Sequence, residues 1–142
     1  MRLIIDANIV IAMFITPGKT AALFFKPSLE LFAPEFLREE LENNLAMLIE
    51  RSVLAEIELL KMLTEVFQRI CFIQEDHLLS HVPEAERITP DPKDMAYFAA
   101  ALHLHCPLWS NERKLKKQDL VKVYATHELM ELLGIPDRPS DL

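Results

Sequence analysis

Short apolar segments alternate with amphipathic, helix-like segments along almost the whole of this chain. The strand-like segments are residues 3–5, 29–33, 71–73, 107–110 and 121–124. The helix-like segments are residues 20–25, 34–52, 53–70, 76–87, 91–105 and 126–133. Strands joined through helices imply right-handed crossovers and a parallel sheet that is covered on both faces. The pattern therefore predicts an α/β fold, a three-layer α/β/α sandwich around a central, mostly parallel sheet of about five strands.

Length and composition favour one domain and exclude some classes of protein. The chain has 142 residues, of which 51% are hydrophobic, and this suits one compact core. We expect a single domain at residues 1–135, followed by a polar, mobile tail at residues 136–142. With 2 glycines and no G-x-G-x-x-G or G-x-x-x-x-G-K pattern, a glycine-cradled nucleotide site is not expected.

Targeting and redox signals are weak in this sequence. No apolar stretch approaches the roughly 20 residues that span a bilayer, and the start does not resemble a secretory signal. We therefore expect a soluble, cytoplasmic protein that does not contact a membrane. Cys71 and Cys106 form no metal-type pair, and the five histidines are scattered in sequence, so a histidine metal site is only a minor possibility.

Acidic side chains collect at the expected ligand-binding edge of the sheet. In such sheets, ligands bind at the carboxyl ends of the strands. Asp6 follows the first strand, and Glu112 follows the fourth. Asp94 heads the buried stripe of the helix before that fourth strand. Helical periodicity places Glu40 on the inward flank of its leucine-rich helix, whereas Glu39 points away.

Each acid also has an ordinary structural explanation. Asp6 can form an Asx-turn, and Asp91 can cap the next helix with Asp94 completing a capping box. Glu40 can be a helix-surface acid, and Glu112 can favour the start of a helix through the helix dipole. Four acids at one edge are harder to explain in this way. Neighbouring carboxylates at about 4 Å repel by about 4 kcal/mol at an effective dielectric near 20, so such a cluster needs a cation.

The same residues resemble the motifs of the PIN-domain family. "IIDANIVIA" resembles its first motif, with Asp6 and Asn8. "APEFLREEL" resembles the segment that carries a helical acid before a leucine, here Glu40. "DPKDMAYFAAAL" and "LWSNERKL" resemble its third and fourth motifs, with Asp94 and the triplet 110–112. The resemblance covers nearly the whole chain, and its chief departure is Glu112 where the family more often has aspartate.

The resemblance implies a metal-dependent nuclease, most often an endoribonuclease, which in prokaryotes is commonly the toxin of a toxin–antitoxin pair. It implies catalytic acids at Asp6, Glu40, Asp94 and Glu112. All-oxygen ligands select Mg²⁺ or Mn²⁺ over softer metals. Asp6 and Asp94 would be the principal metal ligands, with Glu112 and Glu40 bound directly or through water. The supporting residues would be Asn8, Ser110 and, at the rim, Asp91.

Partner predictions depend on local charge and apolar surface. The net charge is −7, yet Arg113, Lys114, Lys116 and Lys117 form a basic run directly after Glu112 that could contact RNA phosphates. A solvated helix face is the simpler interpretation of this run. The apolar surface of segments 21–25 and 53–70 suggests a homodimer or a groove for a cognate antitoxin protein, although plain core packing also accounts for it.

Two other classes of protein remain open. The chain could be a catalytically weak member of the same fold that acts by binding RNA or a protein, because Glu112 departs from the family pattern. It could also be a different doubly wound protein, such as a phosphoryl-transfer or receiver-like domain with an acidic Mg²⁺ pocket. A receiver should have adjacent acids after its first strand, but Asp6 is followed by Ala7.

Overall fold

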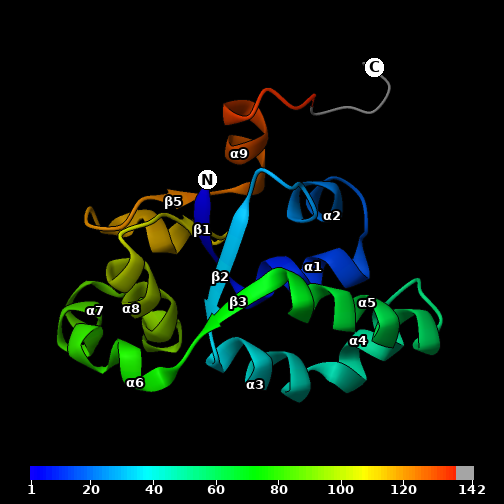
Figure 1. The fold of residues 1–142 in the computed structure, drawn as a ribbon, viewed down its shortest axis with the longest axis horizontal. Helices are drawn as coiled ribbons and strands as arrows, with labels where there is room; N and C mark the ends of the chain where they lie inside the picture. The colour runs from blue at the N-terminus through cyan, green and yellow to red at the C-terminus, as the bar shows by residue number, and fades with distance from the viewer. Residues whose placement is uncertain (137–142) are drawn as a thin grey trace.

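Five parallel strands form the central sheet of the computed structural model, which describes residues 1–136 (Figure 1). The strands are β1 (Arg2–Ile5), β2 (Glu30–Pro34), β3 (Ile70–Ile73), β4 (Leu108–Trp109) and β5 (Val123–Tyr124). Their order in the sheet is β3-β2-β1-β4-β5, and all four pairings are parallel. The predicted α/β fold is confirmed. The expected tail at residues 136–142 lies, apart from its first residue, outside the described part of the chain.

Helices cover the sheet on two sides. The α-helices are α1 (Ala7–Ile15), α2 (Lys19–Phe24), α3 (Phe36–Asn43), α4 (Leu45–Arg51), α5 (Glu56–Arg69), α6 (Glu75–Leu78), α7 (Val82–Ile88), α8 (Met95–Leu104) and α9 (Thr126–Leu132). Three 3₁₀ turns are η1 (Leu79–His81), η2 (Pro92–Asp94) and η3 (Arg113–Lys117). Figure 1 shows α6, α7 and α8 on one side of the strands and α1, α3, α4 and α5 on the other. None of the helices within residues 1–136 is long and apolar enough to cross a membrane.

The core explains why α8 lies so close to the strands. The β1 side chains Leu3, Ile4 and Ile5 are fully buried, as expected for a parallel strand that is covered on both faces. Helix α8 packs on β1, β2 and β4. Its alanines 99–101 are buried and small, and this lets the helix backbone approach the sheet. This packing fixes the position of Asp94 at the start of α8.

The strand order reverses between β1 and β4. From β1 the chain moves outward to β2 and β3, and it then returns to place β4 on the other side of β1. Such a reversal of strand order is where open α/β sheets bind ligands. Ile5 pairs with Trp109, so the residues that follow, Asp6 and Ser110, leave the sheet side by side.

The helix predicted over residues 34–52 is wrong in two respects. Pro34 ends β2 instead of opening a helix, and it pairs with Ile73. Proline is tolerated at this strand end because the next N–H, that of Glu35, donates to the Ile73 carbonyl at 3.2 Å. The helix is also interrupted at Asn44, whose side chain donates to the Glu40 carbonyl at 2.6 Å, a local bond that competes with helix propagation.

Helix α1 is absent from the elements predicted above. Its sequence after Ala7 is almost continuously apolar and rich in β-branched residues, so periodicity does not separate it from a buried strand. The structure resolves the ambiguity because Asp6 caps this helix by accepting a hydrogen bond from the Asn8 N–H at 3.3 Å. The predicted Asx-turn at Asp6 and the helix cap are therefore the same hydrogen bond.

Candidate metal centre

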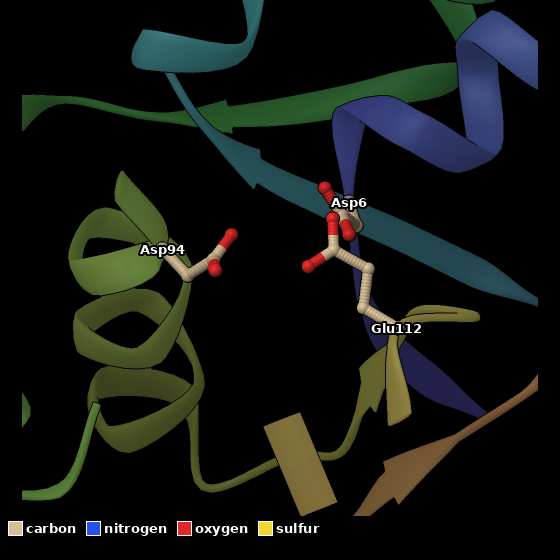
Figure 2. A group of neighbouring side chains, drawn as sticks. All are labelled: Asp6, Asp94 and Glu112. Carbon is tan, nitrogen blue, oxygen red and sulfur yellow. The ribbon is translucent and has the colours of Figure 1, made fainter. Parts of the chain in front are cut away.

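Three carboxylates from separate parts of the chain meet beyond the carboxyl ends of β1 and β4. Asp6 follows β1, Asp94 ends η2 directly before α8, and Glu112 follows β4. One oxygen from each lies within 4.8 Å of the others. Figure 2 shows the Glu112 carboxylate turned toward Asp6, with Asp94 facing both from α8. The structure thus brings together the three residues that the sequence indicates as metal ligands.

Asp6 is held rigidly in this group. Its side chain is buried, and its Oδ2 accepts a hydrogen bond from the Ser110 hydroxyl at 2.7 Å. Ser110 is also buried, and its Oγ accepts from the Glu112 N–H at 3.2 Å. Burial raises the pKa of Asp6, and the Glu112 charge raises it further, against the lowering effect of the Ser110 hydrogen bond. Ser110 therefore links two of the three acids through one hydroxyl.

Glu112 has one satisfied oxygen and one unsatisfied oxygen. Its Oε1 accepts a hydrogen bond from the Asn8 side-chain amide. Its Oε2 is buried without a hydrogen-bond partner among the described residues, although the Lys114 ammonium lies 3.5 Å away. A buried carboxylate oxygen without a hydrogen bond is costly in free energy, and a cation would relieve that cost.

Asp94 has the most perturbed protonation of the three. Its pKa is raised to about 7, first by burial and then by the charges of Glu112 and Asp6. The capping-box role considered above is not observed, because within residues 1–136 its carboxylate accepts no hydrogen bond. Asp91 is the true cap and accepts from the Lys93 N–H at 3.0 Å.

Glu40 lies beside the three-carboxylate group but is not part of it. It is half-buried, and its Oε1 accepts a hydrogen bond from the Tyr97 hydroxyl at 2.5 Å. Burial raises the pKa of Glu40, and the nearby charges of Asp6 and Glu112 raise it further. As predicted, Glu39 on the same helix is exposed. The contribution of the Tyr97 hydroxyl was missed, since it depends on how closely α3 approaches α8.

The basic run is partly neutralised by neighbouring acids. The Lys114 ammonium is 2.8 Å from Asp91 Oδ2, and Lys116 pairs with Glu128. Arg113 and Lys117 are exposed. The hydrogen bond to Lys114 lowers the pKa of Asp91 and raises that of Lys114. Lys114 therefore joins the rim acid Asp91 to Glu112, which is partly buried.

The donor set suits a hard divalent cation. All three side chains of the group offer carboxylate oxygens, and the cysteines and histidines lie elsewhere. Mg²⁺ and Mn²⁺ prefer such oxygen ligands. The unsatisfied Glu112 oxygen and the raised pKa values of Asp6 and Asp94, to both of which the Glu112 charge contributes, indicate negative charge that a cation would compensate. The residues present thus fit a bound Mg²⁺ or Mn²⁺ ion.

The tryptophan beside the site belongs to the core. Trp109 is fully buried, and its indole N–H donates to the Thr126 hydroxyl at 3.0 Å. A ring with no exposed face is not available to stack on a nucleic-acid base. The neighbouring Asn111 accepts a hydrogen bond from the Thr126 N–H at 2.8 Å and fastens the segment after β4 to α9.

Comparison with known proteins finds a matching family model and a similar solved structure. Residues 4–132 match the family model described as "PIN domain". No curated protein sequence matches the chain. A similar fold occurs in the crystal structure of VapBC2 from Rickettsia felis bound to a DNA fragment from their promoter, with a TM-score of 0.67 and 12% identity over 88% of this chain and 98% of that chain. At this identity the likeness concerns the fold alone.

Proposed function

The chain belongs to the PIN domain family, and from this premise we propose that it is a metal-dependent endoribonuclease that hydrolyses RNA phosphodiester bonds. The observation that carries the proposal is the convergence of Asp6, Asp94 and Glu112 at the strand-order reversal, with one buried oxygen lacking a hydrogen bond. Acids with a purely structural role have no need to be brought together from three separate segments of the chain.

The three carboxylates would hold the ion, and their supporting residues would fix its ligands. Mg²⁺ or Mn²⁺ bound here would supply Lewis-acid activation of a water for in-line attack and would offset charge on the leaving oxygen. Ser110 orients Asp6, and Asn8 orients Glu112. Such supporting hydrogen bonds keep ligands in the geometry that a metal requires.

Glu40 would act from the side of the site. The Tyr97 hydroxyl fixes its carboxylate, and its raised pKa makes it able to accept or release a proton nearer neutral pH than an ordinary glutamate. We assign it to holding a water molecule at the edge of the site, directly beside the three ligands.

The basic run would contact the RNA backbone. Arg113 and Lys117 are exposed on η3, which begins directly after Glu112. Phosphate contacts position a nucleic acid without reading its sequence. Lys114 and Lys116 would join them only by exchanging Asp91 and Glu128 for phosphate oxygens.

We further propose that the protein is the toxin of a toxin–antitoxin pair and that it forms a homodimer. The similar solved structure is that of VapBC2 from Rickettsia felis. It supports an antitoxin partner for the present chain by analogy of fold alone. Apolar side chains of residues 53–60 are available for a protein contact, because Val53 and Ile57 are 73% and 66% exposed. Light scattering on a sizing column that showed only monomers would count against the homodimer.

The proposed activity is tested by RNA cleavage with purified protein in Mg²⁺ or Mn²⁺, compared with EDTA. Asp6→Asn and Asp94→Asn should both lose metal-dependent cleavage. Glu39→Gln is a matched control, because Glu39 is an exposed acid next to Glu40 and should retain activity. If the wild type were inert but bound Mn²⁺ in calorimetry, while both Asn variants did not, the chain would be a binding module that retains the site.

A further inference from the structure

Three histidines from separate segments meet near the end of α8 that is remote from the carboxylates. His77 belongs to α6, His81 ends η1 and His103 lies in α8. The Nδ1 atom of His103 is 3.3 Å from Nε2 of His81. The ring of His77 stacks over that of His103, with centroids 6.3 Å apart. Helix α8 contacts both α6 and η1, so the rest of the fold maintains this meeting point.

The spacing of these groups suits metal coordination. His77 and His81 are four residues apart in a continuous helical stretch, and this places both on one face. Two nitrogen ligands of a tetrahedral zinc ion, each about 2.0–2.1 Å from the metal, lie roughly 3.3 Å apart. The His81 and His103 nitrogens already have that separation.

The surroundings of His103 also suit a metal ligand. Burial lowers the pKa of His103, and the neighbouring His81, His77 and His105 lower it further. Within residues 1–136 no acidic side chain forms an ion pair with His77, His81 or His103. Neutral imidazole is the form that binds metals.

We propose that His77, His81 and His103 form a second metal site, which binds a borderline transition-metal ion such as Zn²⁺. His81 and His103 lie within hydrogen-bond distance of each other, and a metal ion would replace the proton that their two ring nitrogens share. His77 is exposed on a short helix and completes the site by a turn of its side chain, since its nitrogen is not yet within reach of both partners. Imidazole nitrogens suit Zn²⁺, whereas the carboxylate group suits Mg²⁺ or Mn²⁺.

The histidine cluster and the three-carboxylate group are separate in space. His103 follows Asp94 by nine residues, which is about 13 Å along a helix axis. A zinc ion at the histidines would fasten α6 and η1 to α8, and it would stabilise the folded chain through binding. This proposal does not rest on nuclease activity.

The test is metal titration of the full chain in excess Mg²⁺, which keeps the carboxylate site filled. Zn²⁺ is titrated by competition with an indicator, and Co²⁺ binding is followed by its visible absorption. We expect one Zn²⁺ per chain. Loss of a supporting residue alone weakens metal binding by 10–100-fold, so His81→Ala and His103→Ala should each weaken it by at least about tenfold. His127→Ala is the control, because it removes a histidine outside the cluster.

Three results would overturn the proposal. They are Zn²⁺ binding weaker than about 1 mM in the wild type, binding that is unchanged in His81→Ala and His103→Ala, or binding that is lost in Asp94→Asn. Circular dichroism checks that each variant is folded. If His103→Ala fails to fold, His77→Ala and His81→Ala carry the test, because neither side chain is fully buried.

Discussion

The two ends of α8 carry clusters of opposite chemistry. At the N-terminal end, Asp94 meets two other carboxylates, of which Asp6 is buried and Glu112 partly buried. Near the C-terminal end, His103 meets two other imidazoles at a partly exposed surface. Burial raises the pKa of Asp94 and lowers that of His103, and the like groups around each residue add to the shift, since both effects disfavour the charged form. Like groups brought together thus leave negative charge at one end, whereas at the other end two imidazoles share a hydrogen bond.

The contacts that hold the side chains in place also differ between the two ends of α8. Ser110 and Asn8 hold the acids by hydrogen bonds that originate at strand ends and at the first turn of α1. The histidines lie on α6, η1 and α8 and are linked to one another by ring contacts. The acid end is therefore preorganised by the sheet, whereas the histidine end would be completed by its metal.

Glu112→Gln should have the largest effect on the acid end. It removes a carboxylate from the proposed metal ligands but keeps the size of the side chain. Metal ions supply several kcal/mol of charge stabilisation, so metal-dependent RNA cleavage should fall by at least about a hundredfold. Cobalt absorption at the histidines should not change. Cleavage at the wild-type rate would remove Glu112 from the site.

Ser110→Ala should weaken the acid end by an intermediate amount. Asp6 would lose its 2.7 Å hydrogen bond and become harder to ionise, so we expect Mn²⁺ affinity to fall by about 10–100-fold in calorimetry. Ser110→Thr should restore much of it, because the hydroxyl remains. Ser28→Ala, at an exposed serine, is the control. Equal affinity in Ser110→Ala and the wild type would contradict the proposed role of this hydroxyl.

Asp94→Asn should stabilise the metal-free protein at pH 8 while it abolishes Mn²⁺ binding. Between about pH 4 and pH 7 the folded state holds a proton on Asp94 that the unfolded state has lost. Its stability therefore falls as pH rises through this window. Asparagine carries no charge, so Asp94→Asn avoids this loss of folding stability. Its melting temperature at pH 8 should therefore rise by a few degrees, since about 1 kcal/mol of stability shifts the melting temperature by roughly 3–6 °C.

Thermal unfolding in EDTA at pH 4.5 and pH 8 measures this difference. Asp94→Asn and wild type should melt closer together at the lower pH. His103→Ala serves as the comparison from the other end of α8. Because the lowered pKa of His103 makes the folded state less stable as pH falls, its removal should cost less stability at pH 4.5 than at pH 8. If Asp94→Asn were less stable than wild type at pH 8, the carboxylates of Asp6, Asp94 and Glu112 would not destabilise the metal-free protein by repulsion.

Tyr97→Phe should have the smallest effect. It removes the hydroxyl that donates to Glu40 at 2.5 Å but leaves the buried ring in place. One hydrogen bond contributes about 1 kcal/mol to stability, so denaturant unfolding should shift by no more than roughly that amount. Tyr124→Phe is the matched control. A loss of cleavage as large as that of Glu112→Gln would instead give the Tyr97 hydroxyl a direct part in the chemistry.

The sequence predicts the acid end better than the histidine end for a physical reason. Asp6 and Glu112 directly follow strands, and parallel strands bring their carboxyl ends to one edge wherever the loops run. Asp94 is fixed by helical periodicity. The histidines instead depend on how α6 and η1 fold back onto α8, and no local pattern reports that packing.

Local sequence patterns also explain which helices and strands were predicted correctly and which were missed. Alternation of apolar strands and amphipathic helices was sufficient for the sheet. Helix α1 was missed because a helix that is apolar on nearly all sides has the appearance of a buried strand. The break at Asn44 was missed because its cause is a side-chain hydrogen bond to Glu40, which hydrophobic periodicity does not detect.

Direct Mn²⁺ binding is the measurement closest to the central claim, that Asp6, Asp94 and Glu112 form a metal site. Calorimetry and electron paramagnetic resonance on wild type, Asp6→Asn, Asp94→Asn and the control Glu39→Gln would decide it. We expect saturable Mn²⁺ binding in wild type and Glu39→Gln and its loss in both Asn variants. Equal Mn²⁺ binding in all four proteins, or none in the wild type, would contradict it.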